Sequence, residues 1–259
     1  MVLPLEIRRA AAGPTAPPRG LHVGTSGWVY KHWKGIFYPE GLRPSGELEF
    51  YAERFPTVEI NVSFYRLPAR SVFEAWKART PPGFLFAVKA SRYLTHMKKL
   101  KDPEEPLALF MEHAQGLGRK LGPILFQFPG TWPVHLDRLE GFLAALSAYP
   151  RRRFAFEFRH ESWLVPEVRS MLARAGAMLC IPVGPGIPFD GSPVGTSAYL
   201  RMHAGSRGTG YGSREIAAWA DRIRGYLRDG VETFVYFNND PDGHALRDAV
   251  RLEEALASA

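Results

Sequence analysis

Apolar residues along the chain form short runs bounded by glycine, proline and polar clusters, a pattern typical of buried β-strands. Such runs predict eight strands, at residues 21–26, 58–64, 84–91, 122–129, 153–160, 177–183, 197–204 and 233–240. Between most of these runs, apolar residues recur at three- and four-residue spacing, which indicates amphipathic helices. The helices are expected at about 47–55, 71–79, 104–120, 135–148, 162–175, 213–229 and 243–257.

Repeated alternation of strand and helix predicts an α/β fold with a parallel sheet, and eight such units favour closure into a (β/α)8 barrel. The 259 residues suit one such barrel, expected over residues 20–259 after a flexible tail at 1–19. The segment VGPGIPFDGSPVGTS lacks helical periodicity, so a Pro/Gly-rich loop is expected in place of the sixth helix. An open doubly wound sheet is the alternative. No G-x-G-x-x-G follows the first strand, so no dinucleotide cofactor is expected.

Polar and apolar side chains alternate within the predicted strands and therefore lie on opposite faces. In the second run, Val58, Ile60, Val62 and Phe64 oppose Glu59, Asn61 and Ser63. Apolar faces must pack under the helices, so the polar faces are expected to point into the barrel. This arrangement places the following residues near the carboxyl ends of the strands, where enzymes of this fold keep their sites: Glu59, Asn61, Lys89, Gln127, Glu157, Arg159, Arg201, His203 and Asn238. The alternative is a buried ion-pair network that closes the barrel interior.

Composition agrees with a globular protein that has a sizeable core, since 46% of the residues are hydrophobic and 23% are charged. The single cysteine, Cys180, lies in the apolar run AMLCIPV, so no intrachain disulfide can form and a reducing compartment is expected. A buried, inert thiol is favoured over a catalytic one. No apolar run is long enough for a membrane span, and the N-terminal segment does not resemble a signal peptide. We therefore expect a cytoplasmic protein without a membrane partner.

A formal net charge of +7 suits an anionic partner. Among the residues expected inside the barrel, the cations Lys89, Arg159 and Arg201 outnumber the carboxylates Glu59 and Glu157. The predicted ligand is therefore a small phosphorylated or carboxylated molecule. The glycine-rich segment AGSRGTGYGS, ahead of the helix at 213–229, either adds backbone N–H groups to this site or forms plain turns.

Aromatic residues follow several of the predicted strands on the same rim, namely Trp28, Tyr30, Tyr65, Trp132 and Trp163. Their flat faces could stack against a nucleobase or a sugar ring. The alternative for each of them is a packing role.

The same residues suit acid–base catalysis, as in isomerases, lyases and hydrolases. The sequence alone does not indicate which of these three enzyme classes applies. Glu157 or Glu59 beside His203 could act as general acid and base, or each carboxylate neutralises a cation. Lys89 could form a Schiff base if it is desolvated beside other cations, although an anion-binding lysine is the favoured interpretation.

Two other function classes stay open. A metal-dependent hydrolase or isomerase would draw on ligand types near strand ends, namely His96, His160, His203, Glu59, Glu157 and Asp240. Neighbouring cations and the absence of an H-x-x-x-H pair disfavour this alternative. A nucleic-acid-binding protein would use the basic surface and the aromatic rim, but the cations of interest lie inside strands and not in a surface stripe. The sequence leaves the oligomeric state open.

Seven blocks that span nearly the whole chain carry a family resemblance: GTSGWVYKHWKGIFYPEG, FYAERFPTVEINVSFYRLP, FAVKASRYLTHMKKLKD, GPILFQFPGTW, FAFEFRHESW, YLRMHAG and VYFNND. Together and in this order they closely resemble the YecE-like family, the domain of unknown function numbered seventy-two. The resemblance implies a TIM-like barrel and brings no assigned activity. The family's marked polar residues fall here on Glu59, Asn61, Lys89, Thr95, His96, Gln127, Glu157, Arg159, His160, Arg201, His203 and Asn239. Ala204 stands where the family more often has glycine, a departure that concerns the local loop shape.

Overall fold

Eight parallel strands close into one barrel, in the order in which they occur along the chain. The computed structural model describes residues 18–257, so residues 1–17 of the predicted tail lie outside the described residues. The TIM-like (β/α)8 barrel predicted from the sequence is therefore confirmed. The strands are β1 Leu21–Ser26, β2 Thr57–Ile60, β3 Leu85–Lys89, β4 Leu121–Gln127, β5 Phe154–Glu157, β6 Met178–Val183, β7 Ser197–Met202 and β8 Glu232–Phe237.

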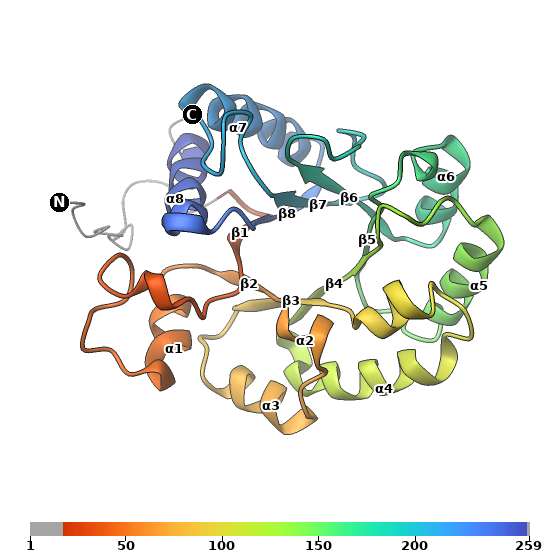
Figure 1. Cartoon of the computed structure of the whole chain (residues 1–259), viewed down its shortest axis with the longest axis horizontal. Helices are drawn as coiled ribbons and strands as arrows, with labels where there is room; N and C mark the ends of the chain where they lie inside the picture. The colour runs from red at the N-terminus through yellow and green to blue at the C-terminus, as the bar shows by residue number, and fades with distance from the viewer. Residues whose placement is uncertain (1–17, 258–259) are drawn as a thin grey trace.

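Helices surround this ring of strands, as Figure 1 shows. They are α1 Glu47–Ala52, α2 Val62–Tyr65, α3 Arg70–Ala78, α4 Glu104–Ala114, α5 Leu136–Leu146, α6 Pro166–Arg174, α7 Ser213–Arg228 and α8 His244–Ala257. Strand β7 follows β6 directly in the order of the described elements, and residues 184–196 connect the two.

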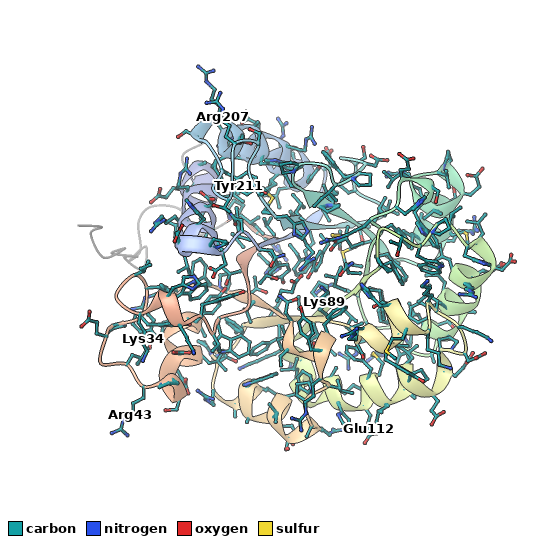
Figure 2. All side chains as sticks on the ribbon, in the orientation of Figure 1. Lys34, Arg43, Lys89, Glu112, Arg207 and Tyr211 are labelled. Carbon is teal, nitrogen blue, oxygen red and sulfur yellow. The ribbon has the colours of Figure 1, made fainter. Side chains whose placement is uncertain are left out.

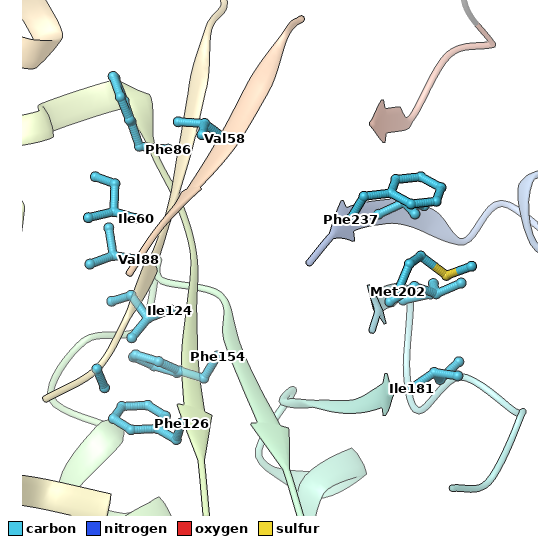
Figure 3. Close-up of a cluster of buried hydrophobic side chains, with 14 of the residues drawn as sticks. Val58, Ile60, Phe86, Val88, Ile124, Phe126, Phe154, Ile181, Met202 and Phe237 are labelled. Carbon is cyan, nitrogen blue, oxygen red and sulfur yellow. The ribbon is translucent and has the colours of Figure 1, made fainter. Parts of the chain in front are cut away.

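Strand alternation divides the buried apolar residues into two cores. The outer core fills the space between strands and helices and includes Val58, Phe86, Phe126 and Met202, some of its members being drawn in Figure 3. The inner core lies inside the barrel and consists of Ala87, Leu125, Ala155, Met178, Cys180, Tyr199, Phe234 and Tyr236. Consecutive residues such as Phe86 and Ala87 belong to different cores, as the period of two in a β-strand requires.

The second predicted strand is too long. Strand β2 ends at Ile60, and residues 62–65 form the short helix α2, so Val62 is exposed and does not pack under a helix. Phe64 N donates to Asn61 O (3.0 Å), and Ser63 Oγ donates to Lys89 O (2.6 Å). An alternating pattern does not reveal where a strand must end, because the turn is fixed here by a bond to the neighbouring strand.

Cys180 is buried in the inner core, where burial raises the pKa of its thiol well above the usual value. The thiol is therefore protonated and enclosed, which agrees with the inert interpretation. Among the helices of residues 18–257, none has the length and apolar character needed to cross a membrane.

Candidate functional site

Arg201 of β7 lies at the centre of a buried ion-pair network near the carboxyl ends of the strands. Its Nε and Nη2 donate to the two carboxylate oxygens of Glu59, at 3.0 and 2.8 Å. Its Nη1 donates to Glu157 Oε2 at 2.7 Å. All three side chains are almost fully enclosed. The guanidinium thus joins β7 to β2 and β5 across the barrel interior.

Glu59 is saturated by its neighbours. Besides Arg201, it accepts a short hydrogen bond from Ser26 Oγ and another from Tyr199 OH at 2.6 Å. Burial alone would raise the pKa of Glu59, but Arg201 and these donors bring it below the usual value. A carboxylate with four donors and no exposure has no room for a substrate. Glu59 and Arg201 thus satisfy one another inside the barrel, which agrees with the alternative of a buried ion-pair network, and the catalytic role of Glu59 and the ligand-binding role of Arg201 stay predictions.

A second, more open layer lies above this network. Arg159 Nε donates to Glu157 Oε1 at 2.7 Å, while about a third of the Arg159 side chain (34%) is exposed. His203 Nε2 lies 3.6 Å from the same Glu157 oxygen, and Asn238 Nδ2 donates to His203 Nδ1 at 3.0 Å. Burial is the main cause that lowers the pKa of His203, so the ring is neutral near pH 7. Arg201 and its neighbours hold the pKa of Glu157 well below its usual value against the effect of burial.

Lys89 ends β3 and reaches the inside of the ring of strands, where Figure 2 labels it. Its Nζ lies 4.2 Å from the centroid of the Phe64 ring. Burial, followed by the charge of Arg201, lowers the pKa of Lys89 to about 8. Within residues 18–257, no carboxylate lies within ion-pair distance of this ammonium group. Lys89 is thus a largely enclosed cation that lacks an anionic partner.

His96 lies beside Lys89, in a turn of π-helix at Tyr93–Met97. Its ring contacts the edge of Phe64 with centroids 5.0 Å apart, and its Nδ1 is 2.9 Å from Thr95 Oγ1. Burial and the charge of Lys89 lower the pKa of His96. Single π-helical turns occur frequently at functional sites. Lys89 and His96 therefore both contact the Phe64 ring.

Other predicted binding residues lie around this centre. Asn61 Nδ2 donates to Ser26 Oγ at 2.6 Å, and Gln127 Nε2 donates to Phe128 O at 2.7 Å. His160 Nδ1 accepts from Ser162 N at 3.2 Å and caps a short 3-10 helix. Together with Arg159, His160 lines a cavity of about 520 Å³ that residues 186–188 bound on the far side.

Most of the predicted aromatic rim packs into the outer core. Trp28 contacts Trp76 and Phe86, and Trp163 stacks on Phe158 with ring centroids 4.2 Å apart. Trp28, Trp132 and Trp163 are all buried, so they cannot stack on a ligand. Tyr65 alone among the predicted stacking residues is largely exposed, at 73%. The tryptophans follow strands in sequence, yet the loops that carry them fold back onto the helices.

Asn239 lies in the contact between the glycine-rich loop and α8. Its Nδ2 donates to Thr209 O and to Asp248 Oδ2, both at 2.8 Å, and the side chain is buried. It therefore fastens the glycine-rich loop to α8 and does not face the barrel axis. Asp240 accepts from Trp33 Nε1 at 2.8 Å. In the part of the chain that the structure describes, no three His, Cys, Asp or Glu side chains are grouped so that they could hold a metal ion.

Ser26 and Tyr199 belong to the network, although neither is a predicted site residue. Both complete the hydrogen bonding of Glu59. Tyr199 has an inward position in the same alternation as Arg201, and Ser26 ends the first strand. The alternation along the strands therefore indicated where Ser26 and Tyr199 lie, but it did not indicate that both bind Glu59.

Comparison with known proteins adds relatives without an assigned activity. Residues 22–259 match the family described as "Protein of unknown function DUF72". The chain is 24% identical to the UPF0759 protein YunF of Bacillus subtilis, over 91% of this chain and 94% of that protein. It is 27% identical to the UPF0759 protein YecE of Escherichia coli K12, over 54% of this chain and 48% of that protein. The crystal structure of a DUF72 family protein from Thermotoga maritima is similar with a TM-score of 0.78 and 30% identity, covering 91% of this chain and 98% of that one.

Proposed function

The chain belongs to the DUF72 family, and on this premise we propose that it binds a small phosphorylated or carboxylated ligand at the carboxyl ends of its barrel strands. In this proposal, Lys89 and Arg159 hold the anion, and His203 exchanges protons with it. The protein would then be an enzyme that uses acid–base chemistry, as isomerases, lyases and hydrolases do.

The observation that carries the proposal is the unpartnered ammonium group of Lys89. Enclosing a cation without a counter-ion is unfavourable, and its lowered pKa reflects this. By contrast, Arg201 lies deeper and is fully paired with Glu59 and Glu157. An anionic ligand beside Lys89 would attract its ammonium group and so offset the cost of enclosing this charge.

The balance of charge supports the same proposal. Lys89, Arg159 and Arg201 contribute three positive charges, while Glu59 and Glu157 contribute two negative ones, which leaves one positive charge. The exposed part of Arg159 faces the cavity of about 520 Å³, so its guanidinium can donate to a ligand there while its Nε stays on Glu157.

His203 is the favoured acid–base group, with Glu157 as its positioning residue. Its ring is neutral near pH 7, and only 12% of the side chain is exposed. Glu157 stays ionised next to it and would stabilise the imidazolium that forms when His203 takes up a proton.

A ligand screen followed by a pH series tests the proposal. Thermal-shift assays against phosphorylated sugars, nucleotides and carboxylates would identify a stabilising anion, and Lys89→Met should abolish its effect. Between pH 7.5 and 9.5 the affinity of the wild type should fall on the order of tenfold, because Lys89 loses its proton above pH 8. The variant Lys89→Arg stays charged and should show no such fall. Equal wild-type affinity at both pH values would contradict the proposal.

A further inference from the structure

A groove runs along the contact between the glycine-rich loop after β7 and the start of α8, and Lys89 does not line it. It has a volume of about 1000 Å³ and lies between residues 206–215 and residues 244–251. In Figure 1 this is the region between α7 and α8, and Figure 2 shows Arg207 extending from its edge. None of the residues proposed above to hold the central ligand lines this groove.

The lining carries an excess of positive charge. Four arginines line the groove, whereas the acids are Glu215 and Asp248, so the excess is two positive charges with His244 neutral. Both acids are engaged by backbone donors: Glu215 accepts from Ser206 N at 2.8 Å and Gly212 N at 2.7 Å, and Asp248 accepts from Tyr211 N at 3.0 Å. Glu215 is thus held against the loop backbone, although the charge of Arg207 still acts on it, and Asp248 is held by Tyr211 N and Arg251.

Only one of the four arginines has a structural partner. Arg251 Nη1 donates to Asp248 Oδ1 at 2.9 Å and to Tyr211 O at 2.7 Å. For Arg207, Arg214 and Arg247, the described part of the chain offers no hydrogen-bond or ion-pair partner to the side chain. Arg214 and Arg247 thus lack a direct partner within residues 18–257, and an anion in the groove would be attracted to both.

The groove is shaped by close backbone packing. A Cβ atom on Gly210 would lie 2.6 Å from His244 Nδ1, and one on Gly205 would lie 2.3 Å from Gly210 O. Side chains are thus excluded at both positions, which keeps the loop close to α8. The N-termini of α7, with 16 residues, and of α8, with 14 residues, both open into the groove. Their helix dipoles add to the positive potential.

We infer that this groove is a second anion site, which binds the phosphate group of a small phosphorylated ligand through Arg214 and Arg247. A phosphate group fits better than a carboxylate, since it carries up to two charges and three acceptor oxygens for several guanidinium donors. Phosphate sites on barrels of this kind are often built in part from the loop after the seventh strand, and this groove is lined by that loop and by the first half of α8. The inference does not depend on the function proposed for Lys89.

Calorimetric titration with inorganic phosphate at low ionic strength tests the inference. The full chain is used in a Lys89→Met background, in which the ligand site proposed at Lys89 is disabled. Phosphate binding by this variant therefore reports on the groove alone, and its absence says nothing about the site at Lys89. Saturable binding is expected, and Arg214→Gln and Arg247→Gln should each raise the Kd about tenfold. The matched control is Arg174→Gln, which removes an exposed arginine in the last turn of α6 and should leave the Kd unchanged.

Melting temperatures in phosphate-free buffer should agree among all these variants, because the substituted side chains are not part of the core. Several outcomes would overturn the inference: no saturable binding, an equal loss with Arg174→Gln, or acetate bound as tightly as phosphate. Tighter binding of single-stranded DNA, lost in the same arginine variants, would also overturn it in favour of a nucleic-acid surface.

Discussion

Lys89 and Arg201 are both cations inside the same end of the barrel, but their surroundings differ. Arg201 makes hydrogen bonds to two carboxylates, and its pKa is raised well above the usual value although burial opposes this. Lys89 Nζ lies over the ring of Phe64, and burial is the main cause that lowers its pKa to about 8. A buried charge that is paired within the protein has a structural role, whereas an unpaired one is available to bind a ligand.

At the residue scale, Lys89→Met should raise the free energy of unfolding at pH 7 by about 2 kcal/mol. Below pH 8, Lys89 is charged in both the folded and the unfolded chain, so the desolvation penalty is fully present. As the pH rises through 8 the folded wild type loses the proton and the advantage of methionine shrinks. Urea unfolding at pH 7 and pH 10 measures this, with the exposed Lys101→Met as the control. A methionine variant less stable than the wild type at pH 7 would show that Lys89 supports the fold.

Strand β1 packs closely against β2 at Gly24. Gly24 pairs with Thr57 of β2, and a Cβ atom there would lie 2.1 Å from Thr57 O and 3.1 Å from Tyr51 OH. Tyr51 OH also donates to Thr57 O at 3.0 Å and accepts from Thr25 N at 2.9 Å. The Thr57 carbonyl of β2, with the Tyr51 hydroxyl beside it, thus fills the place that a residue larger than glycine would need.

At the element scale, Gly24→Ala should lower the free energy of unfolding by about 3 kcal/mol, because the backbones of β1 and β2 must separate. Gly41→Ala is the matched control, since nothing lies within 4 Å of its added Cβ atom. Chemical denaturation of both variants measures the difference. Similar stabilities for the two would mean that β1 can shift without loss.

The whole barrel depends on polar contacts as well as on its cores. The inner apolar core fills only part of the lumen, and the Glu59, Arg201 and Glu157 side chains occupy the end toward the site. These charges come from β2, β5 and β7, which are not neighbours in the sheet, so the network joins strands that make no direct hydrogen bonds to one another.

At the scale of the whole molecule, Arg201→Met should destabilise the fold by about 3–5 kcal/mol, because it leaves two enclosed carboxylates without a counter-charge. Asp221→Asn, which weakens a surface pair with Arg224 and leaves the Arg224 side chain in place, should change the stability by less than about 1 kcal/mol. Thermal or urea unfolding of both variants gives the comparison. If the two losses were equally small, water or a shifted pKa would have to satisfy Glu59 and Glu157.

Local sequence patterns were sufficient to predict where the strands lie and which of their side chains point into the barrel. The period of two in β7 placed Tyr199 and Arg201 inside, and the structure agrees. The same reasoning failed at residues 62–64, where α2 begins, and at the tryptophans, because the ends of strands and the course of loops depend on distant partners.

The sequence by itself determined the family, through seven ordered blocks, and the barrel, through eight strand–helix units. It also determined the set of polar side chains that face the interior, since this follows from the period of two within each strand. Only the tertiary structure decided which of those side chains neutralise one another and which stay open. Arg201 meets Glu59 and Glu157 across the barrel, while Lys89 meets no carboxylate in the described residues. The physical reason is that ion pairing depends on distances of a few ångströms between strands far apart in sequence, and closure of the barrel sets those distances.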